Sequence, residues 1–349
     1  MSNVANRIPD LESERRLAEI RSKASQSGPL TAKGIVPVGA PFPQANPQNG
    51  YYGVPLLKEP QWKPEIPLYF FVGGAAGAAA VVASTANWIS RDRELVRSAR
   101  WLAAVGGPIS AALLTKDLGV PSRFLNMLRV FKAQSPMSVG AWTLSAFSSF
   151  AAASAFANLM QDKFPGVPIS FLENASGLLA AATGTVMSSY TGVLIGATVI
   201  PVWNNHVGTL PMHFAASGMN SAVSILELMG HDSSRALNLL GLAASVYETT
   251  EGVVIETEQS RVNKPLKQGA SGWTVRIGGL LSGPLPLALR LVYSVTGNKK
   301  VRRAAAISSI AGSLLTRFGW LSAGRASARD ASLPLQANQH DNVQPAILA

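Results

Sequence analysis

The sequence contains no cysteine. This absence excludes disulfides, iron–sulfur clusters held by thiolates and covalently attached haem c in this chain, because each of them needs a cysteine sulfur. Charged side chains are also scarce, at 14% of the residues, whereas 47% are hydrophobic. If the protein takes part in electron transfer, the electron carrier must therefore be bound non-covalently here or be fixed in a partner protein.

The scarcity of charge is not uniform along the chain. Residues 66–90 carry no formally charged side chain, and a helix of this length crosses the roughly 30 Å hydrocarbon core of a bilayer at about 1.5 Å per residue. Similar apolar blocks recur as far as Gly319, so we expect an all-α polytopic membrane protein with about eight transmembrane helices in a bundle. The expected spans are Ile66–Ile89, Trp101–Thr115, Met137–Met160, Asn174–Trp203, Val207–Leu228, Ala236–Ile255, Trp273–Val292 and Ala304–Trp320.

The two ends of the chain differ in composition from the middle. Residues 1–50 are polar and rich in Pro, Gly, Ser and Asn, which predicts a flexible tail with a short surface helix at Asp10–Ala24. We expect one transmembrane domain over residues 51–322 and a second flexible tail over 323–349. No secretory signal peptide is visible. The Lys and Arg residues of the loops favour a multi-pass protein of the cell (cytoplasmic) membrane, with both termini on the cytoplasmic side.

The chain carries a net charge of +11, which in a soluble protein would suggest nucleic-acid binding. In a membrane protein, basic loops instead lie against anionic lipid headgroups. We therefore expect a lipid membrane and no nucleic acid among the partners. The four histidines are poorly spaced for the two facing axial ligands of a haem b, and no Cys/His/Asp cluster predicts a metal site.

Ionisable side chains inside the apolar blocks are candidates for function, because burying them in a membrane is costly. Glu248 and Glu251 are three residues apart and share one helix face. Glu227 lies late in the fifth block, and Glu173 lies at the mouth of the fourth. A carboxyl shielded from water can take up and release protons near neutral pH, so these four residues are candidates for proton transfer. Structural ion pairs with the arginines of the seventh block are the alternative.

Two further groups of residues suggest contacts with other molecules. Tyr69 and Tyr190 lie inside uncharged blocks, where a phenol needs a hydrogen-bond partner such as a quinone carbonyl or a main-chain carbonyl. The loop from Lys116 to Lys132 mixes charge, proline and aromatic residues. It serves either to dock a soluble subunit or to anchor the chain to headgroups. Its candidate docking residues are Asp117, Arg123 and Arg129.

Several longer motifs carry a resemblance to a known family. They are Tyr52–Trp62 with Pro67–Gly77, Asp117–Val130 with Ser135–Trp142, and Tyr190–Leu194 with Pro201–Asn204. In these motifs the chain resembles the NrfD / polysulfide reductase membrane-subunit family over about residues 50–320. The resemblance implies an eight-helix subunit that binds menaquinone or another quinone non-covalently and has no haem or iron–sulfur cluster of its own. It implies quinone contacts near the start of the first span, at Tyr69, Gly73 and Gly74, and in the fourth span, at Tyr190.

The resemblance also implies partners and an activity. The partners are a ferredoxin-like iron–sulfur subunit and, usually, a molybdopterin catalytic subunit. We expect a membrane anchor and quinone-binding subunit of a multi-subunit oxidoreductase, which passes electrons between membrane quinol and the iron–sulfur subunit. Whether the chain is non-catalytic or quinone-reactive stays open, and we assign it no catalytic residue. The alternatives are a structural anchor without quinone chemistry and a proton-coupled secondary transporter.

Overall fold

The computed structural model describes residues 57–330 apart from Arg91 and Pro165, together with Arg15, Ala18, Glu19 and Ser22. These last four residues are helical and exposed, as expected for a surface helix. The rest of the predicted N-terminal tail lies outside the described residues, as does the predicted C-terminal tail from residue 331 onward. The described residues contain helices and no strand, which confirms the all-α prediction.

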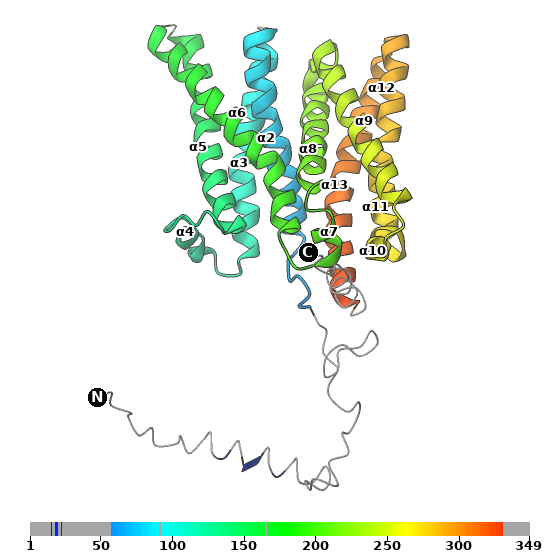
Figure 1. Cartoon of the computed structure of the whole chain (residues 1–349). Coiled ribbons are helices and arrows are strands. Elements are labelled where there is room, and N and C mark those ends of the chain that lie inside the picture. The colour runs from blue at the N-terminus through cyan, green and yellow to red at the C-terminus, as the bar shows by residue number, and fades with distance from the viewer. Residues whose placement is uncertain are drawn as a thin grey trace, which may run out of the picture.

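The helices form an elongated bundle (Figure 1). The first half of the chain supplies α2 (Glu65–Ile89), α3 (Arg93–Asp117), a 3₁₀ turn (Pro121–Arg123), α4 (Phe124–Met127), α5 (Pro136–Lys163) and α6 (Val167–Gly196). The second half supplies α7 (Pro201–Asn205), α8 (Leu210–Leu226), a π-helical turn (Glu227–His231), α9 (Arg235–Thr257), a 3₁₀ turn (Arg261–Asn263), α10 (Lys264–Lys267), α11 (Gly269–Ser282), α12 (Pro284–Thr296) and α13 (Lys299–Arg329). The short helices α4, α7 and α10 lie at one end of the bundle, which we call the α7 end (Figure 1).

Polar side chains fix where several helices begin. Asp92, Ser135, Ser234 and Asn298 each precede a long helix and accept a hydrogen bond from a main-chain N–H of its first turn. Such N-caps satisfy donors that have no partner within the helix. They place the connections at the ends of the bundle.

Two predicted spans are interrupted. The block predicted as one helix over Asn174–Trp203 ends as α6 at Gly196, and the chain turns before Pro201 begins α7. The block Trp273–Val292 breaks at Gly283, between α11 and α12. Both new helices start with proline, which lacks the N–H that a continuing helix needs and is tolerated in the first turn.

The predicted boundary of the C-terminal tail at residue 323 is also wrong. The helix α13 continues to Arg329, and Ala323, Gly324, Ser327 and Ala328 are buried. Small side chains on this last part of α13 let it pack against Trp203 of α7, whose indole N–H donates to the carbonyl of Trp320 at 2.8 Å.

Among the described residues, four stretches are long and apolar enough to cross a membrane: Glu65–Ile89, Pro136–Gln161, Pro168–Gly196 and Gly269–Thr296. Multiple membrane-spanning helices are therefore present, whereas the expected count of eight is not confirmed. The remaining long helices, α3, α8, α9 and α13, carry more charged and polar side chains. Many of these side chains, such as Arg100, Glu248 and Arg317, are buried between helices.

Small residues bring the helices of the interior into close contact. Gly77 of α2 and Gly184 of α6 face each other so closely that a Cβ on either would collide with the carbonyl of the other. Gly74 of α2 lies against Gly218 of α8, where a Cβ on Gly218 would collide with the carbonyl of Gly74. Close approach of backbones is how helices gain van der Waals contact where lipid removes the hydrophobic driving force.

Candidate functional site

The two tyrosines predicted to contact quinone lie in one cavity. Tyr69 of α2 and Tyr190 of α6 are both buried and line a space of about 70 Å³ at the α7 end. No hydrogen bond joins either hydroxyl to another described residue. We call this space the tyrosine cavity. Its wall also includes Trp62, Ile66, Phe70, Leu114, Asp117, Met127, Met137 and Leu194.

The segment just before α2 covers this end of the bundle. Trp62 stacks on Trp203 of α7, with ring centroids 5.6 Å apart, and meets the edge of Phe70. Arg325 of α13 donates to the main-chain carbonyl of Trp62. The cavity is therefore closed by a strap, residues 57–64, that is tied to the C-terminal end of α13.

An exposed ion pair adds to this attachment. Arg329 donates to both carboxylate oxygens of Glu59 at 2.9 and 2.8 Å. The hydrogen bonds from Arg329 hold the pKa of Glu59 below its ordinary value. Because solvent screens such a pair, it positions the strap more than it stabilises the fold.

Gly73 and Gly74 do not line the tyrosine cavity. A Cβ on Gly73 would collide with the side chain of Met187 in α6, and one on Gly74 would touch Gly218 and Arg317. Both glycines therefore serve the packing of α2 against its neighbours, and their contact with a quinone stays a prediction.

The predicted docking residues lie beside this cavity. Asp117 is half-buried at the end of α3, lines the cavity and accepts a hydrogen bond from the main-chain N–H of Lys63 at 3.0 Å. Arg123 and Arg129 lie in the connection around α4, and both are exposed. The structure thus joins Asp117 to the cavity and leaves the two arginines on the surface of the α7 end.

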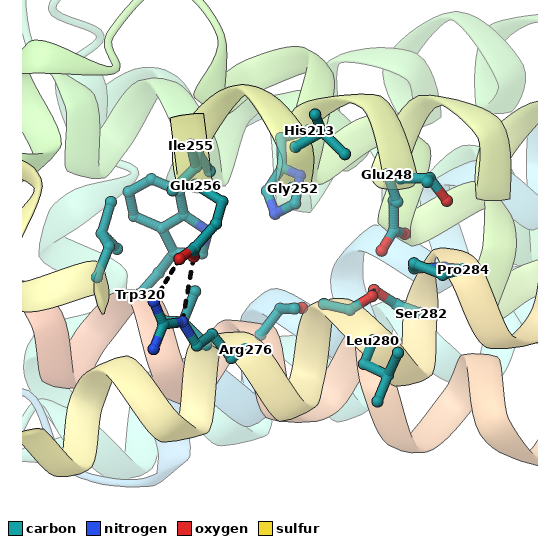
Figure 2. A pocket seen from close by; sticks show the side chains of 16 residues that line it. His213, Glu248, Gly252, Ile255, Glu256, Arg276, Leu280, Ser282, Pro284 and Trp320 are labelled. Carbon is teal, nitrogen blue, oxygen red and sulfur yellow. Dashed lines mark hydrogen bonds and ion pairs between the residues drawn. The ribbon is translucent and has the colours of Figure 1, made fainter. Parts of the chain in front are cut away.

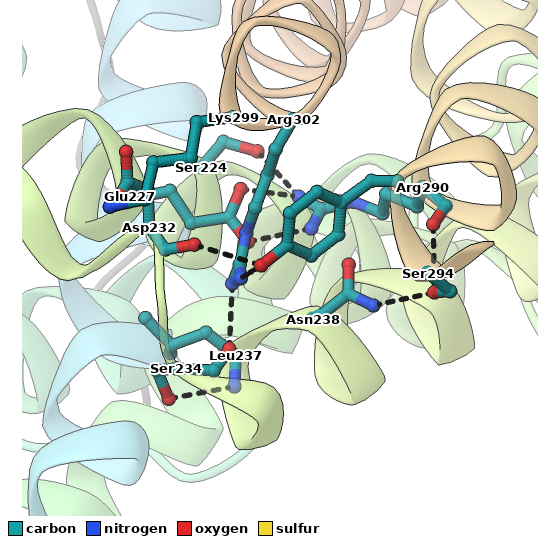
Figure 3. Close-up of polar contacts among 11 residues, drawn as sticks. Ser224, Glu227, Asp232, Ser234, Leu237, Asn238, Arg290, Ser294, Lys299 and Arg302 are labelled. Carbon is teal, nitrogen blue, oxygen red and sulfur yellow. Dashed lines mark hydrogen bonds and ion pairs between the residues drawn. The ribbon is translucent and has the colours of Figure 1, made fainter. Parts of the chain in front are cut away.

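Two of the four candidate carboxylates are paired with arginine. Glu173 of α6 bonds to Arg100 of α3 and accepts from Asn158 of α5 at 2.8 Å. Glu227 in the π-helical turn is bonded by Arg290 and Arg302, and all three side chains are fully buried (Figure 3). Of the arginines considered as partners from the sequence, Arg290 pairs with Glu227, whereas Arg276 bonds to Glu256.

The other two candidates, on α9, are unpaired. Glu248 is buried, and neither of its carboxylate oxygens has a hydrogen-bond partner among the described residues. Glu251 is buried on the same helix and forms no ion pair with a described residue. Glu248 lines a cavity (Figure 2). The roles of all four carboxylates in proton transfer stay predictions.

This second cavity contains a residue that the sequence did not single out for it. His213 of α8 lines the same space as Glu248, and neither nitrogen of its buried ring has a hydrogen-bond partner in the described part of the chain. The sequence shows His213 and Glu248 as polar residues within apolar blocks. Their proximity depends on the packing of α8 against α9, which spacing along the chain does not give. Within the described residues no group of His, Asp or Glu side chains forms a metal site.

The fold and its buried charged groups define a polytopic all-α membrane protein with interior sites. A model of the family described as polysulphide reductase, NrfD, matches residues 58–235. The chain therefore belongs to the polysulphide reductase NrfD family, whose members are membrane subunits of oxidoreductase complexes and partner with other subunits of those complexes. Among curated proteins no match was found. The matched stretch contains the whole tyrosine cavity and ends at the start of α9.

Proposed function

We propose that this protein is the membrane anchor and quinone-binding subunit of an oxidoreductase complex. It would pass electrons between membrane quinol and an iron–sulfur subunit docked at the α7 end. The observation that supports this proposal best is the tyrosine cavity, where two buried phenols from different helices have hydroxyls with no partner in the described protein. A buried hydroxyl without a partner is costly, and a carbonyl oxygen of a ligand would satisfy it.

In this proposal the residues of the cavity bind and orient the quinone. Tyr69 and Tyr190 donate hydrogen bonds to its oxygens, while Trp62 and Phe70 contact the ring. Asp117 lines the cavity and would be the nearest carboxylate to take up a proton from a bound ring. The bound quinone would supply the two-electron redox chemistry, which no side chain of a chain without cysteine provides.

The cavity volume bears on how a ring would enter. About 70 Å³ holds a few waters and is less than half of the 150 Å³ or so that admits benzene in a protein interior. Met127 and Met137 line the cavity, and Met137 is 52% exposed. Methionine side chains rearrange easily because they are unbranched. Binding would therefore displace these methionines and not the rigid aromatic residues.

The same end of the bundle suits the docking of a partner. Exposed Arg123 and Arg129 lie next to the cavity. An acidic surface on a ferredoxin-like iron–sulfur subunit would pair with them and bring a cluster close to the quinone. A molybdopterin subunit would then bind to the iron–sulfur subunit and not to this chain. The orientation that we propose places both termini and the α7 end on the cytoplasmic side of the cell membrane.

Carboxylates that form no ion pair with an arginine would carry the protons. Glu248 and Glu251 meet this condition, whereas the charges of Glu173 and Glu227 are compensated by their bonded arginines. Of these two, we propose Glu248 as the principal carrier because it lines a cavity.

The test is quinol oxidation by the reconstituted complex and quinone binding by the purified chain, each with Tyr69→Phe, Tyr190→Phe and the double variant. Losing one hydrogen bond at each hydroxyl should weaken quinone binding by about 3- to 10-fold per tyrosine. Tyr247→Phe is the matched control, because Tyr247 lies on α9 outside the cavity. Unchanged binding in the double variant would contradict the proposed contacts. Intact docking in a complex that binds no quinone would favour a structural anchor.

A further inference from the structure

A second cavity lies between α9, α11, α12 and α13, and His213 of α8 also lines it (Figure 2). Its volume is about 250 Å³, against about 70 Å³ for the tyrosine cavity. We call it the α9–α11 cavity. Its apolar wall includes Val253, Ile255, Leu266, Val275, Leu280 and Trp320. Except for α8, the helices around it follow the stretch that matches the family.

Two glycines keep this space open. Gly252 of α9 and Gly279 of α11 both line the cavity, and a Cβ on either would meet no atom within 4 Å. Elsewhere in the bundle a Cβ on a packed glycine, such as Gly77 or Gly184, would collide with a neighbouring backbone. The glycines at the cavity therefore do not serve helix contact. Their missing side chains leave room.

Two buried polar side chains face this room without partners. Glu248 is 2% exposed and His213 is 6% exposed. Neither carboxylate oxygen and neither ring nitrogen has a hydrogen-bond partner in the described residues. Unsatisfied polar groups of this kind are rare in folded proteins and call for an explanation.

The surroundings of these two groups are partly polar. The side chains of Ser217, Asn220 and Ser282 are near enough to influence the Glu248 carboxylate, but none of them forms a hydrogen bond of normal geometry with it. Arg317 of α13 lies nearby and donates one hydrogen bond, to the carbonyl of Phe214 at 2.9 Å. The inner end of the cavity is thus polar and can form several hydrogen bonds, while the remainder is apolar.

The cavity opens on the outer face of the bundle. Val253 and Leu280 line it and are 57% and 56% exposed. The Glu256–Arg276 ion pair lies at the same opening (Figure 2). Leu280 and Arg276 belong to a stretch long and apolar enough to span a membrane, so a ligand would enter from the lipid.

We propose that the α9–α11 cavity is a second binding site, for a lipid-soluble hydroquinone ring. A cavity of about 150 Å³ admits benzene, so 250 Å³ accommodates a fused bicyclic ring. Glu248 accepts a hydrogen bond from one ring hydroxyl, His213 accepts one from the other, and Trp320 contacts the ring. An acyl chain would fill the same volume but leave both polar groups unsatisfied. The site is separate from the tyrosine cavity and does not depend on the role proposed for it.

The test counts binding sites in the full chain reconstituted in nanodiscs. The probe is heptyl hydroxyquinoline N-oxide, a fluorescent bicyclic quinol analogue whose emission is quenched on binding. We expect two probe molecules per native chain and one per Gly252→Leu chain, because leucine fills the α9–α11 cavity while leaving every polar group intact. Gly252→Ala is the matched control and should keep both sites. Gly279→Leu fills the cavity from the opposite wall and repeats the test on another helix.

The polar groups are tested separately. Glu248→Met and His213→Phe should each weaken the probe at this site by about 3- to 10-fold, since each variant removes the acceptor of one hydrogen bond. Tyr69→Phe and Tyr190→Phe should leave this site unchanged. If only the tyrosine variants lose probe, the second site is refuted and the tyrosine cavity stands. If only the glycine variants lose it, the second site stands and the proposed function loses its site. Two sites retained in a folded Gly252→Leu chain would overturn the inference.

Discussion

Removing the carboxylate of Glu227 should destabilise this protein more than removing any exposed carboxylate that binds an arginine. Glu227 is bonded by Arg290 at 2.6 and 3.0 Å and by Arg302 at 3.0 and 2.8 Å. All three side chains are fully buried. The variant Glu227→Gln keeps the shape of the side chain and leaves two guanidinium groups in the interior without a compensating anion.

The expected loss follows from the burial. Breaking a buried ion pair by removing one partner costs about 3–5 kcal/mol, because the remaining charge stays desolvated. Arg302 also donates to the hydroxyl of Tyr293 and the carbonyl of Ser234, so part of its hydrogen bonding survives. We therefore expect Glu227→Gln to lower the free energy of unfolding by about 3–5 kcal/mol.

The chain offers a matched control. Glu59 also bonds to an arginine, Arg329, but the two side chains are 30% and 70% exposed and lie outside the membrane-spanning stretches. The same change, Glu59→Gln, should cost less than about 1 kcal/mol because solvent already screens this pair. Denaturant titration in mixed micelles, followed by circular dichroism, measures both losses. Equal losses in the two variants would refute the argument from burial.

Replacement of the whole cluster is a second check on the same reasoning. Exchanging Glu227, Arg290 and Arg302 together for apolar side chains of similar volume removes all three charges. A large part of the lost stability should return, because no desolvated charge is left. A triple variant as unstable as Glu227→Gln would show that the loss comes from packing and not from charge.

Two further predictions concern packing and pH. Gly77→Ala should lower the free energy of unfolding by about 1–3 kcal/mol, because the added methyl group forces α2 away from Gly184. Gly279→Ala is the control and should not lower it, because a Cβ there meets no neighbouring atom. Equal losses in the two variants would refute the reasoning. Asp232 lies in a loop where the hydrogen bond from Lys299 lowers its pKa below the ordinary value. A lowered pKa stabilises the fold above the unfolded value of about 3.9, and this contribution is lost as the pH falls further. Asp232→Asn should therefore lower the free energy of unfolding at pH 7. The variant should also lose less stability than the native protein when the pH is lowered. Unchanged stability at pH 7 would contradict this prediction.

The first and third spans could be predicted almost to the residue. Ile66–Ile89 became α2, Glu65–Ile89, and Met137–Met160 became the centre of α5, Pro136–Lys163. Both are uninterrupted apolar runs with proline only at the start, so a local property decides the outcome. The breaks before Pro201 and Pro284 were signalled in the sequence by the prolines themselves. We predicted unbroken spans there because the sequence is hydrophobic on both sides of each proline.

The candidate sites were also predictable only in part. The sequence identified Tyr69, Tyr190 and Glu248 as polar groups in apolar surroundings, and the structure brings the two tyrosines into one cavity. The sequence did not indicate that His213 lines the same cavity as Glu248, nor that Arg302 joins Arg290 in bonding Glu227. Such proximities depend on the rotation of each helix about its axis, which many contacts across the bundle set together.

By itself the sequence determined that this chain lies in a membrane as helices and that it holds no redox centre through cysteine. Those properties follow from the length of apolar runs and from which atoms the side chains contain. Only the tertiary structure decided which buried charges are neutralised and which face open space. Glu227 and Glu248 lie in similar apolar blocks, yet one is bonded by two arginines and the other faces a cavity. That difference arises because residues distant along the chain meet only when the helices pack.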